Sequence, residues 1–267
     1  MITPNYFDSH SHIHFDQFDA DRNDVIARMD HAGIWTIAVG TNYETSKNAL
    51  LLAERHSNIF ATVGIHPTEE KESFNGTRFE ALVQKSKVVA VGECGLDYYR
   101  IESTDVSEKA RQEKEFRAQI LFAAKHNKPL MLHVRPSSGS TDAHDDALRI
   151  LSELQAQFPN IRGTSHFFTS SLAVAKQYLA IGFHISIPGV VTFDKALEEV
   201  VAGIPLERLL SETDSPYATP APHRGKRNEP FFVIPIVEAI ARIKHMPLTD
   251  VRTQLFVNTA RLFGIQL

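Results

Sequence analysis

Cysteine and long apolar runs are both scarce in this sequence. Cys94 is the single cysteine among 267 residues, so no intrachain disulfide can form; a reducing compartment suits such a chain, and we predict a cytoplasmic location. No apolar run approaches the roughly 20 residues that a membrane-spanning helix needs. The stretch Met1–Asn5 lacks the basic region and apolar segment of a signal peptide. We therefore expect neither a signal peptide nor a membrane partner.

An excess of positive charge is also lacking. The chain has 28 Lys and Arg against 32 Asp and Glu, a formal net charge of -4, which excludes nucleic-acid binding by bulk positive charge. A polyanion would have to be held by a local basic patch and bound metal. A hydrophobic content of 43% and a mean hydropathy of -0.19 are typical of a globular protein. With no internal repeat or long linker, we predict one domain over residues 1–267, and we assume a monomer.

Short apolar runs alternate with longer amphipathic stretches along the whole chain. This alternation is typical of βα units around a parallel sheet. The expected strands are 6–10, 34–40, 60–65, 88–92, 129–134, 161–166, 183–187 and 209–213, and the expected helices are 21–31, 44–55, 108–126, 230–243 and 248–263. Eight strands predict a closed (β/α)8 TIM barrel. An open doubly wound sheet is the alternative, but no glycine-rich phosphate loop follows the first strand.

The segment Phe7-Asp8-Ser9-His10-Ser11-His12 joins the first strand to a pair of histidines. Side chains two apart in a strand share a face. We therefore expect Asp8, His10 and His12 on one face, with Phe7 and the two serines on the other. The histidines would be able to share a metal ion.

Acidic residues and histidines recur at the expected carboxyl ends of the other strands, where barrel enzymes carry their catalytic groups. The ligand-type residues are His10, His12, Glu93, His133, His166 and Asp214. Six such residues suit two divalent ions better than one, because one tetrahedral zinc needs three protein ligands. A glutamate such as Glu93 can give one oxygen to each ion. Two ions can share a hydroxide and clamp a phosphoryl group, and Asp214 could also take the proton of the attacking water.

Several motifs together resemble a known family. They are Asp8-Ser9-His10-Ser11-His12, Gly64-Ile65-His66-Pro67, Val91-Gly92-Glu93-Cys94-Gly95-Leu96-Asp97-Tyr98, Leu132-His133-Val134-Arg135, Glu212-Thr213-Asp214-Ser215-Pro216-Tyr217 and Pro222-His223-Arg224-Gly225-Lys226-Arg227-Asn228-Glu229-Pro230. In this order they resemble the TatD family of metal-dependent deoxyribonucleases, within the amidohydrolase-like barrels. The resemblance covers nearly the whole chain.

The resemblance implies hydrolysis of DNA phosphodiester bonds, with 3′-to-5′ exonuclease action on single strands. It implies a first metal ion on His10, His12, Glu93 and Asp214, and a second on Glu93, His133 and His166. His66 is similar to a family histidine that reaches the substrate phosphate. The ions would be Mg, Mn or Zn, since this ligand set suits all three. Catalysis would rest on Asp214 and Glu93.

Two features depart from the family pattern. Ser170 stands where the family usually has a glycine, which would allow a positive φ or a close backbone approach. The segment 136–142 after Arg135 looks longer than usual and would overhang the metal ions. These departures bear on the shape of the substrate pocket.

Other side chains are candidates for substrate contacts. The segment 222–230 is the compact basic patch of the sequence, and Arg224 and Lys226 could bind phosphate there. Arg135 could do the same or pair with an acid, and Tyr217 could stack on a base or serve packing. Asp8 could orient a ligand histidine or support a turn, Asp97 would brace its loop, and Cys94 would pack away from the site.

Three functions remain open on the sequence. The first is the metal-dependent deoxyribonuclease acting on single-stranded DNA. The second keeps the metal centre but hydrolyses a carbonyl substrate, such as an aminoacyl ester on tRNA, because the same hydroxide attacks carbonyls. The third is a metal-binding scaffold without turnover, and the complete ligand set argues against it.

Overall fold

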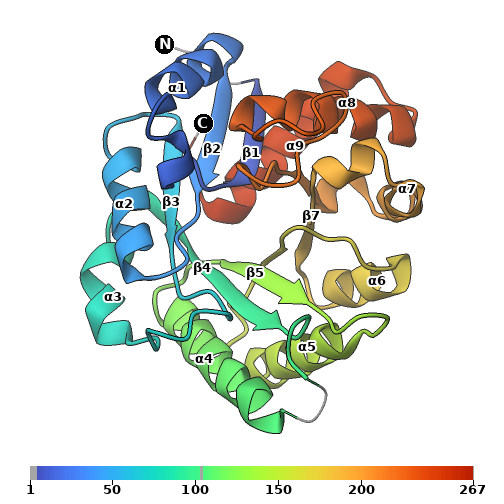
Figure 1. Ribbon diagram of the computed structural model, residues 1–267. Coiled ribbons are helices and arrows are strands. Elements are labelled where there is room, and N and C mark those ends of the chain that lie inside the picture. The colour runs from blue at the N-terminus through green and yellow to red at the C-terminus, as the bar shows by residue number, and fades with distance from the viewer. Residues whose placement is uncertain (1–4, 103–104, 267) are drawn as a thin grey trace.

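The computed structural model describes residues 5–102 and 105–266, and it confirms the predicted barrel. Eight parallel strands follow one another around a single sheet in the order of the sequence. They are β1 (Tyr6–Ser11), β2 (Ile34–Ala38), β3 (Ile59–Val63), β4 (Val88–Asp97), β5 (Leu130–Arg135), β6 (Gly163–Ser165), β7 (His184–Ile187) and β8 (Leu209–Ser211). Figure 1 shows the strands inside a ring of helices.

The last strand returns to the first and nearly closes the sheet. The amide of Asp214 donates to the carbonyl of His10 at 2.9 Å, and the amide of His12 donates to the carbonyl of Ser215 at 2.7 Å. The side chain of Asp8 adds to this closure, because its carboxylate accepts hydrogen bonds from the amide and the hydroxyl of Thr213. The segments that follow β1 and β8 therefore lie side by side at the carboxyl end of the barrel.

Helices cover the outside of the barrel. They are α1 (Arg22–Ala32), α2 (Tyr43–Ala53), α3 (Gly76–Val83), α4 (Val106–Lys125), α5 (Asp142–Gln155), α6 (Leu172–Ala180), α7 (Lys195–Gly203), α8 (Val233–Lys244) and α9 (Leu248–Phe263). Short 3-10 turns lie at Asp16–Phe18, Gly189–Thr192, Leu206–Arg208 and Pro230–Phe232. Among the helices of the described residues, none has the length and apolar content to cross a membrane.

The hydrophobic interior falls into two clusters. The larger one packs the helices against the strands, with buried residues from Ile13 to Leu255. The smaller one joins Phe7, Met131 and Leu210 of three different strands with Phe256 of α9. Burial of these apolar side chains stabilises the barrel that carries the polar strand ends.

The structure corrects the expected alternation of side chains along the first strand. The β1–β2 ladder is irregular between Asp8 and Ser11, and this irregularity interrupts the simple two-residue period. Ser9 consequently reaches Ser186 of β7, a strand that is not its neighbour, at 2.9 Å. Asp8 does not share a face with His10 and His12, because its carboxylate is held by the hydroxyls of Thr36 and Thr213.

Candidate metal centre

Glu93 lies in the middle of the polar cluster at the carboxyl end of the barrel. It belongs to β4, which extends to Asp97 and is longer than expected, and only 3% of the residue is exposed. Two glycines allow β4 to pass close to β5: a Cβ on Gly92 would lie 2.5 Å from the carbonyl oxygen of Met131, and one on Gly95 would lie 2.0 Å from that of His133. The close approach places Glu93 and His133 side by side.

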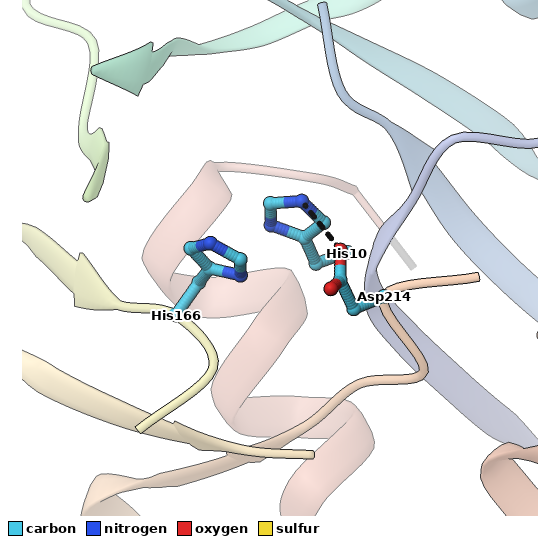
Figure 2. A group of neighbouring side chains, drawn as sticks. All are labelled: His10, His166 and Asp214. Carbon is cyan, nitrogen blue, oxygen red and sulfur yellow. Dashed lines mark ion pairs between the residues drawn. The ribbon is translucent and has the colours of Figure 1, made fainter. Parts of the chain in front are cut away.

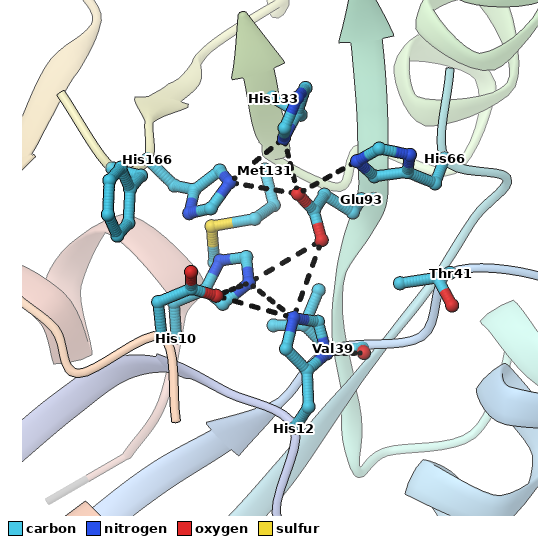
Figure 3. A network of polar contacts seen from close by, with 12 residues as sticks. His10, His12, Val39, Thr41, His66, Glu93, Met131, His133 and His166 are labelled. Carbon is cyan, nitrogen blue, oxygen red and sulfur yellow. Dashed lines mark hydrogen bonds and ion pairs between the residues drawn. The ribbon is translucent and has the colours of Figure 1, made fainter. Parts of the chain in front are cut away.

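One oxygen of Glu93 faces a first group of ligand atoms from β1 and the segment after β8. Its Oε2 atom lies 3.6 Å from Nε2 of His10 and 3.7 Å from Nε2 of His12. Oδ1 of Asp214 lies 3.5 Å and 3.4 Å from the same two nitrogens. The two Nε2 atoms are 3.3 Å apart, so four donor atoms surround one small space (Figure 3).

The other oxygen of Glu93 faces a second group from β5, β6 and the loop after β3. Its Oε1 atom lies 2.9 Å from Nδ1 of His133 and 2.8 Å from Nε2 of His166. Nε2 of His66 is 3.5 Å from the same oxygen, and Figure 3 shows the three rings turned toward it. His66, expected to reach a substrate phosphate, is therefore also close enough to join this group.

The spacing of the first group fits a divalent cation. Bonds of roughly 2.1 Å in a tetrahedral shell place neighbouring ligand atoms about 3.4 Å apart. The separations between the two Nε2 atoms, and from each of them to Oε2 of Glu93 and Oδ1 of Asp214, are 3.3 to 3.7 Å and match this edge. Imidazole nitrogens and carboxylate oxygens are also ligands that zinc and manganese accept. The residues present therefore could hold a metal ion.

His10 connects the two groups. Its ring stacks on that of His166 with the centroids 3.8 Å apart, and Figure 2 shows both rings beside Asp214. Nδ1 of His10 is buried and has no hydrogen-bond partner among the described residues. Ligand atoms of His10, His166 and Asp214 lie within 4.8 Å of one another, so the groups form one continuous cluster.

Three of the rings are oriented through their second nitrogen. Nδ1 of His12 donates to the carbonyl of Val39 at 2.8 Å. Nε2 of His133 lies 3.0 Å from Oδ2 of Asp97, and Nδ1 of His166 lies 3.3 Å from Oε1 of Glu212. Such outer partners fix the tautomer and rotation of metal-binding histidines. The contact of Asp97 gives this residue a specific role beyond the expected bracing of a loop.

The buried charges of the cluster balance one another. Burial acts against the ionised carboxylate, but the neighbouring His166 holds the pKa of Glu93 well below its usual range. Burial acts against a charged His166 as well, yet the Glu93 and Glu212 carboxylates raise the pKa of His166 well above its usual value. Burial and the nearby His166 lower the pKa of His10 to about 4. The cluster thus combines an ionised carboxylate at Glu93 with a neutral imidazole at His10.

A cavity of about 790 Å³ opens over the cluster. Of the residues expected to contact substrate, three line it: His66, Arg135 and Tyr217. Tyr217 is 48% exposed, and Arg135 lies over the ring of Tyr99 with its guanidinium carbon 3.8 Å from the centroid. These side chains therefore share one cavity with Glu93, His133 and Asp214.

The basic side chains of the segment 222–230 do not line the cavity. Arg224 and Lys226 are exposed and do not line the cavity, and the Arg224 guanidinium stacks on the ring of Phe193 at 3.9 Å. The neighbouring Arg227 forms a bidentate pair with Asp21. The segment itself lies beside the loop that carries Asp214, because Asn228 donates to the carbonyls of Thr213 and Tyr217, but its arginine and lysine side chains do not reach the cavity wall.

Two further expectations concern residues beside the cluster. Cys94 is buried in the larger hydrophobic cluster, which confirms its packing role. Ser170 lines the cavity without a positive φ; the left-handed backbone of this loop is at Phe167, with φ of 46°. A glycine is therefore not required at position 170. The segment 136–142 contributes Pro136 and Ser140 to the wall.

The sequence did not reveal two of the groups around this site. Glu212 accepts a hydrogen bond from the amide of Phe167 at 2.5 Å as well as contacting His166. Its position two residues before Asp214 was the one feature of the sequence that could have pointed to a role for Glu212 at the site. His144 of α5 lines the cavity although it lies inside a helix, and no local pattern distinguishes it from a surface histidine.

Comparisons with known proteins agree with this geometry. The model of a family described as TatD related DNase matches residues 7–264. An uncharacterized metal-dependent hydrolase of Bacillus subtilis is 38% identical over 97% of this chain and 99% of that protein. A protein of Klebsiella pneumoniae named 3′-5′ ssDNA/RNA exonuclease TatD is 34% identical over 94% of this chain and 95% of its own length.

Solved structures show the same relationship. The crystal structure of a TatD homologue from Escherichia coli superposes with a TM-score of 0.86 at 28% identity, covering 98% of each chain. The family match, the hydrolase relatives and the cluster of His, Glu and Asp ligands together indicate a metal-dependent hydrolase. The chain belongs to the TatD-related DNase family.

Proposed function

We propose that this protein is a metal-dependent nuclease that cleaves phosphodiester bonds of DNA as a 3′-to-5′ exonuclease on single strands. The observation that carries the proposal is the position of Glu93, whose two oxygens face two separate groups of ligand atoms below an open cavity. A carboxylate placed in this way suits a pair of divalent ions, the arrangement used for in-line displacement at phosphorus. The name of the Klebsiella relative supports the same substrate class.

The ligand-type residues divide between two sites in this proposal. His10, His12, Glu93 and Asp214 hold one ion, and Glu93, His133 and His166 hold the other. Mg, Mn or Zn ions bound there supply a more acidic water and positive charge against the phosphate oxygens. One domain spanning residues 1–267 carries the whole centre.

The chain's own side chains bind the substrate and move the proton. The Asp214 side chain is 14% exposed and faces the cavity, so its carboxylate can take the proton of the attacking water. Glu93 keeps the two groups of ligands in register. His66 and Arg135 hold phosphate oxygens, and Tyr217 offers a face on which a base stacks. Arg224 and Lys226 lie outside the cavity and add only weak electrostatic attraction for the strand.

A nuclease assay tests this proposal. Purified protein is incubated with a 5′-labelled single-stranded oligodeoxynucleotide and Mg²⁺, Mn²⁺ or Zn²⁺, and the products are resolved by length. We expect a ladder of products shortened from the 3′ end, abolished by a chelator. The absence of metal-dependent cleavage with all three ions would refute the proposal.

A second candidate is hydrolysis of a carbonyl ester, including an aminoacyl ester on tRNA. The observation that favours it is the position of Arg224 and Lys226, because their charges do not line the cavity and phosphate is not the sole group that fits there. Assays of a DNA oligonucleotide and an aminoacyl-tRNA under the same conditions separate the two. Release of the amino acid without DNA cleavage would establish the esterase, and metal binding without either activity would indicate a scaffold.

A further inference from the structure

The cavity extends beyond the ligand cluster toward two helix N-termini. On this side its wall is formed by Arg135, Ser140, His144, Thr169 and Ser170, which together we call the α5–α6 lobe. Ser140 and His144 flank the start of α5, and Thr169 and Ser170 precede Ser171, whose hydroxyl caps α6. Figure 1 shows α5 and α6 as neighbours outside β5. The lobe thus combines hydroxyl groups, an imidazole and a guanidinium at two helix N-termini.

His144 is the buried member of the lobe. Only 3% of the residue is exposed, and its Nδ1 atom lies 3.1 Å from the hydroxyl oxygen of Tyr178 on α6. Nε2 has no hydrogen-bond partner among the described residues. It is not one of their fully enclosed polar atoms, so it is partly accessible. Because His144 lines the cavity, we infer that this partnerless nitrogen is the atom offered to a ligand there.

The partner of Nδ1 determines which nitrogen of His144 carries the proton. Tyr178 is fully buried, and His144 is the hydrogen-bond partner of its hydroxyl among the described residues. If Nδ1 carried the proton, the hydroxyl hydrogen of Tyr178 would remain buried without an acceptor, which is unfavourable. The hydroxyl of Tyr178 therefore donates to Nδ1, and Nε2 carries the proton of the ring.

The electrostatics of the lobe suit an anion. Burial lowers the pKa of His144 to about 4, so at neutral pH the ring is a neutral donor. The nearest acids on α5 do not line the cavity: Asp142 pairs with Lys109, and Asp145 accepts from the hydroxyl of Thr141. The first turn of α5 already carries Asp142 and Asp145, and Asp142 accepts hydrogen bonds from the amides of Ser137 and Ala143, so the helix dipole that favours an anion in the lobe is that of α6. Arg135 supplies the full positive charge of this wall.

We propose that the α5–α6 lobe binds a second phosphate group of the substrate, with Nε2 of His144 donating to a phosphate oxygen. The inference rests on the proposed nuclease function and deepens it: one phosphate lies at the metal centre and an adjacent one lies in the lobe. Tyr178 is a positioning residue, because it acts through the tautomer of His144. The substrate class is therefore a nucleotide chain with at least two neighbouring phosphates.

Binding of two small ligands to the metal-loaded protein tests the lobe. Thymidine 3′,5′-bisphosphate carries a second phosphate that thymidine 5′-monophosphate lacks. Calorimetry should show the bisphosphate binding about tenfold or more tightly, the range of one hydrogen bond to a charged group. His144→Leu should reduce this preference to within about twofold, and the exposed control His31→Leu should keep it. Equal affinities in the parent protein, or an unchanged preference in His144→Leu, would overturn the proposal.

Two measurements protect the test against a variant that does not fold. His144→Gln retains an N–H donor near the position of Nε2 and should keep part of the preference, whereas the exposed Thr169→Val should lower it severalfold. Nitrogen NMR of the parent protein should show His144 protonated at Nε2, with that signal shifted by the bisphosphate. A proton on Nδ1, or no shift, would refute the assigned geometry.

The outcomes separate this inference from the proposed function. If the parent protein cuts DNA but His144→Leu keeps the preference for the bisphosphate, the proposed role of the lobe is refuted and the nuclease function stands. If the parent protein prefers the bisphosphate but cuts no DNA, the nuclease function is refuted and the lobe remains a binding site for the bisphosphate.

Discussion

The two groups of ligand atoms around Glu93 are built in different ways. The first group, from β1 and the segment after β8, has separations of 3.3 to 3.7 Å. In the second group, His133 and His166 lie 2.9 and 2.8 Å from the same oxygen, which are hydrogen-bond distances. The first group thus keeps the spacing of a cation shell, whereas the second group contracts around the carboxylate.

The supports of the two groups explain this difference. The first group is fixed by main-chain contacts: His10 and His12 bond the backbone after β8, and the ring of His12 bonds the carbonyl of Val39. The second group is oriented by the side chains of Asp97 and Glu212. Side chains rotate more easily than a closed barrel deforms, so the second site is expected to bind its ion more weakly and to be easier to disrupt by mutation.

The largest expected effect comes from the first group. Asp214→Asn removes a ligand charge and the proton acceptor, so metal-dependent turnover should fall by about 10²–10⁴-fold while the protein stays folded. Steady-state kinetics on single-stranded DNA and circular dichroism measure the two quantities. Asp250→Asn, at an exposed position of α9, serves as the control. Full activity of Asp214→Asn would remove Asp214 from the mechanism.

Changes in the outer carboxylates test the second group directly. Glu212→Gln and Asp97→Asn should each weaken binding of one ion by about 10–100-fold, because the rings of His166 and His133 lose their charged partners. Calorimetric titration of the metal-free protein should show the tighter site unchanged. Equal weakening of both sites would contradict the assignment of separate supports to the two groups.

The support of the first group is tested through stability. Asp8→Ala leaves the buried amide and hydroxyl of Thr213 without their acceptor, so the free energy of unfolding should fall by about 2–4 kcal/mol. Asp8→Asn retains an acceptor oxygen and should cost less. Urea denaturation measures both variants. An Asp8→Ala protein as stable as the parent would show that the closure of β1 on β8 does not depend on this side chain.

The smallest effects should come from the basic residues. Arg135→Ala, on the cavity wall beside the second group, should raise KM for single-stranded DNA several-fold and reduce the salt slope of binding by about one. Arg224→Ala and Lys226→Ala lie outside the cavity and should change KM by no more than about twofold. Fluorescence anisotropy at several salt concentrations provides the comparison. A larger loss at Arg224 or Lys226 would move the substrate path toward the basic segment.

Much of the architecture followed from local patterns. Apolar runs alternating with amphipathic stretches predicted all eight strands, because each buried strand must be covered by a helix. Helices α3, α5, α6 and α7 were not assigned residues, although Asn75, Ser171 and Asp194 cap the first turns of α3, α6 and α7. Those three helices are eight or nine residues long, too short for a clear 3.6-residue period, but α5 has 14 residues, so its length does not explain why it was missed.

The candidate site was predictable where it depends on strand ends. Parallel strands bring their carboxyl ends to one edge, so residues as distant as His10 and Asp214 could be grouped before the structure was known. The side-chain contacts could not be grouped in this way. The Asp8 carboxylate is bound by the hydroxyls of Thr36 and Thr213 and not by a histidine ring, and the Arg224 guanidinium stacks on Phe193 and not on the cavity wall. Both depend on tertiary packing, which sequence spacing does not encode.

The closure of the barrel has a consequence during synthesis. Asp214 and the backbone groups that bond β1 are translated some 200 residues after His10. A nascent chain that stops before β8 lacks both Asp214 and the partner strand of β1. The cluster is therefore assembled only once β8 has been made and pairs with β1, and translation products that stop before β8 are expected to be inert.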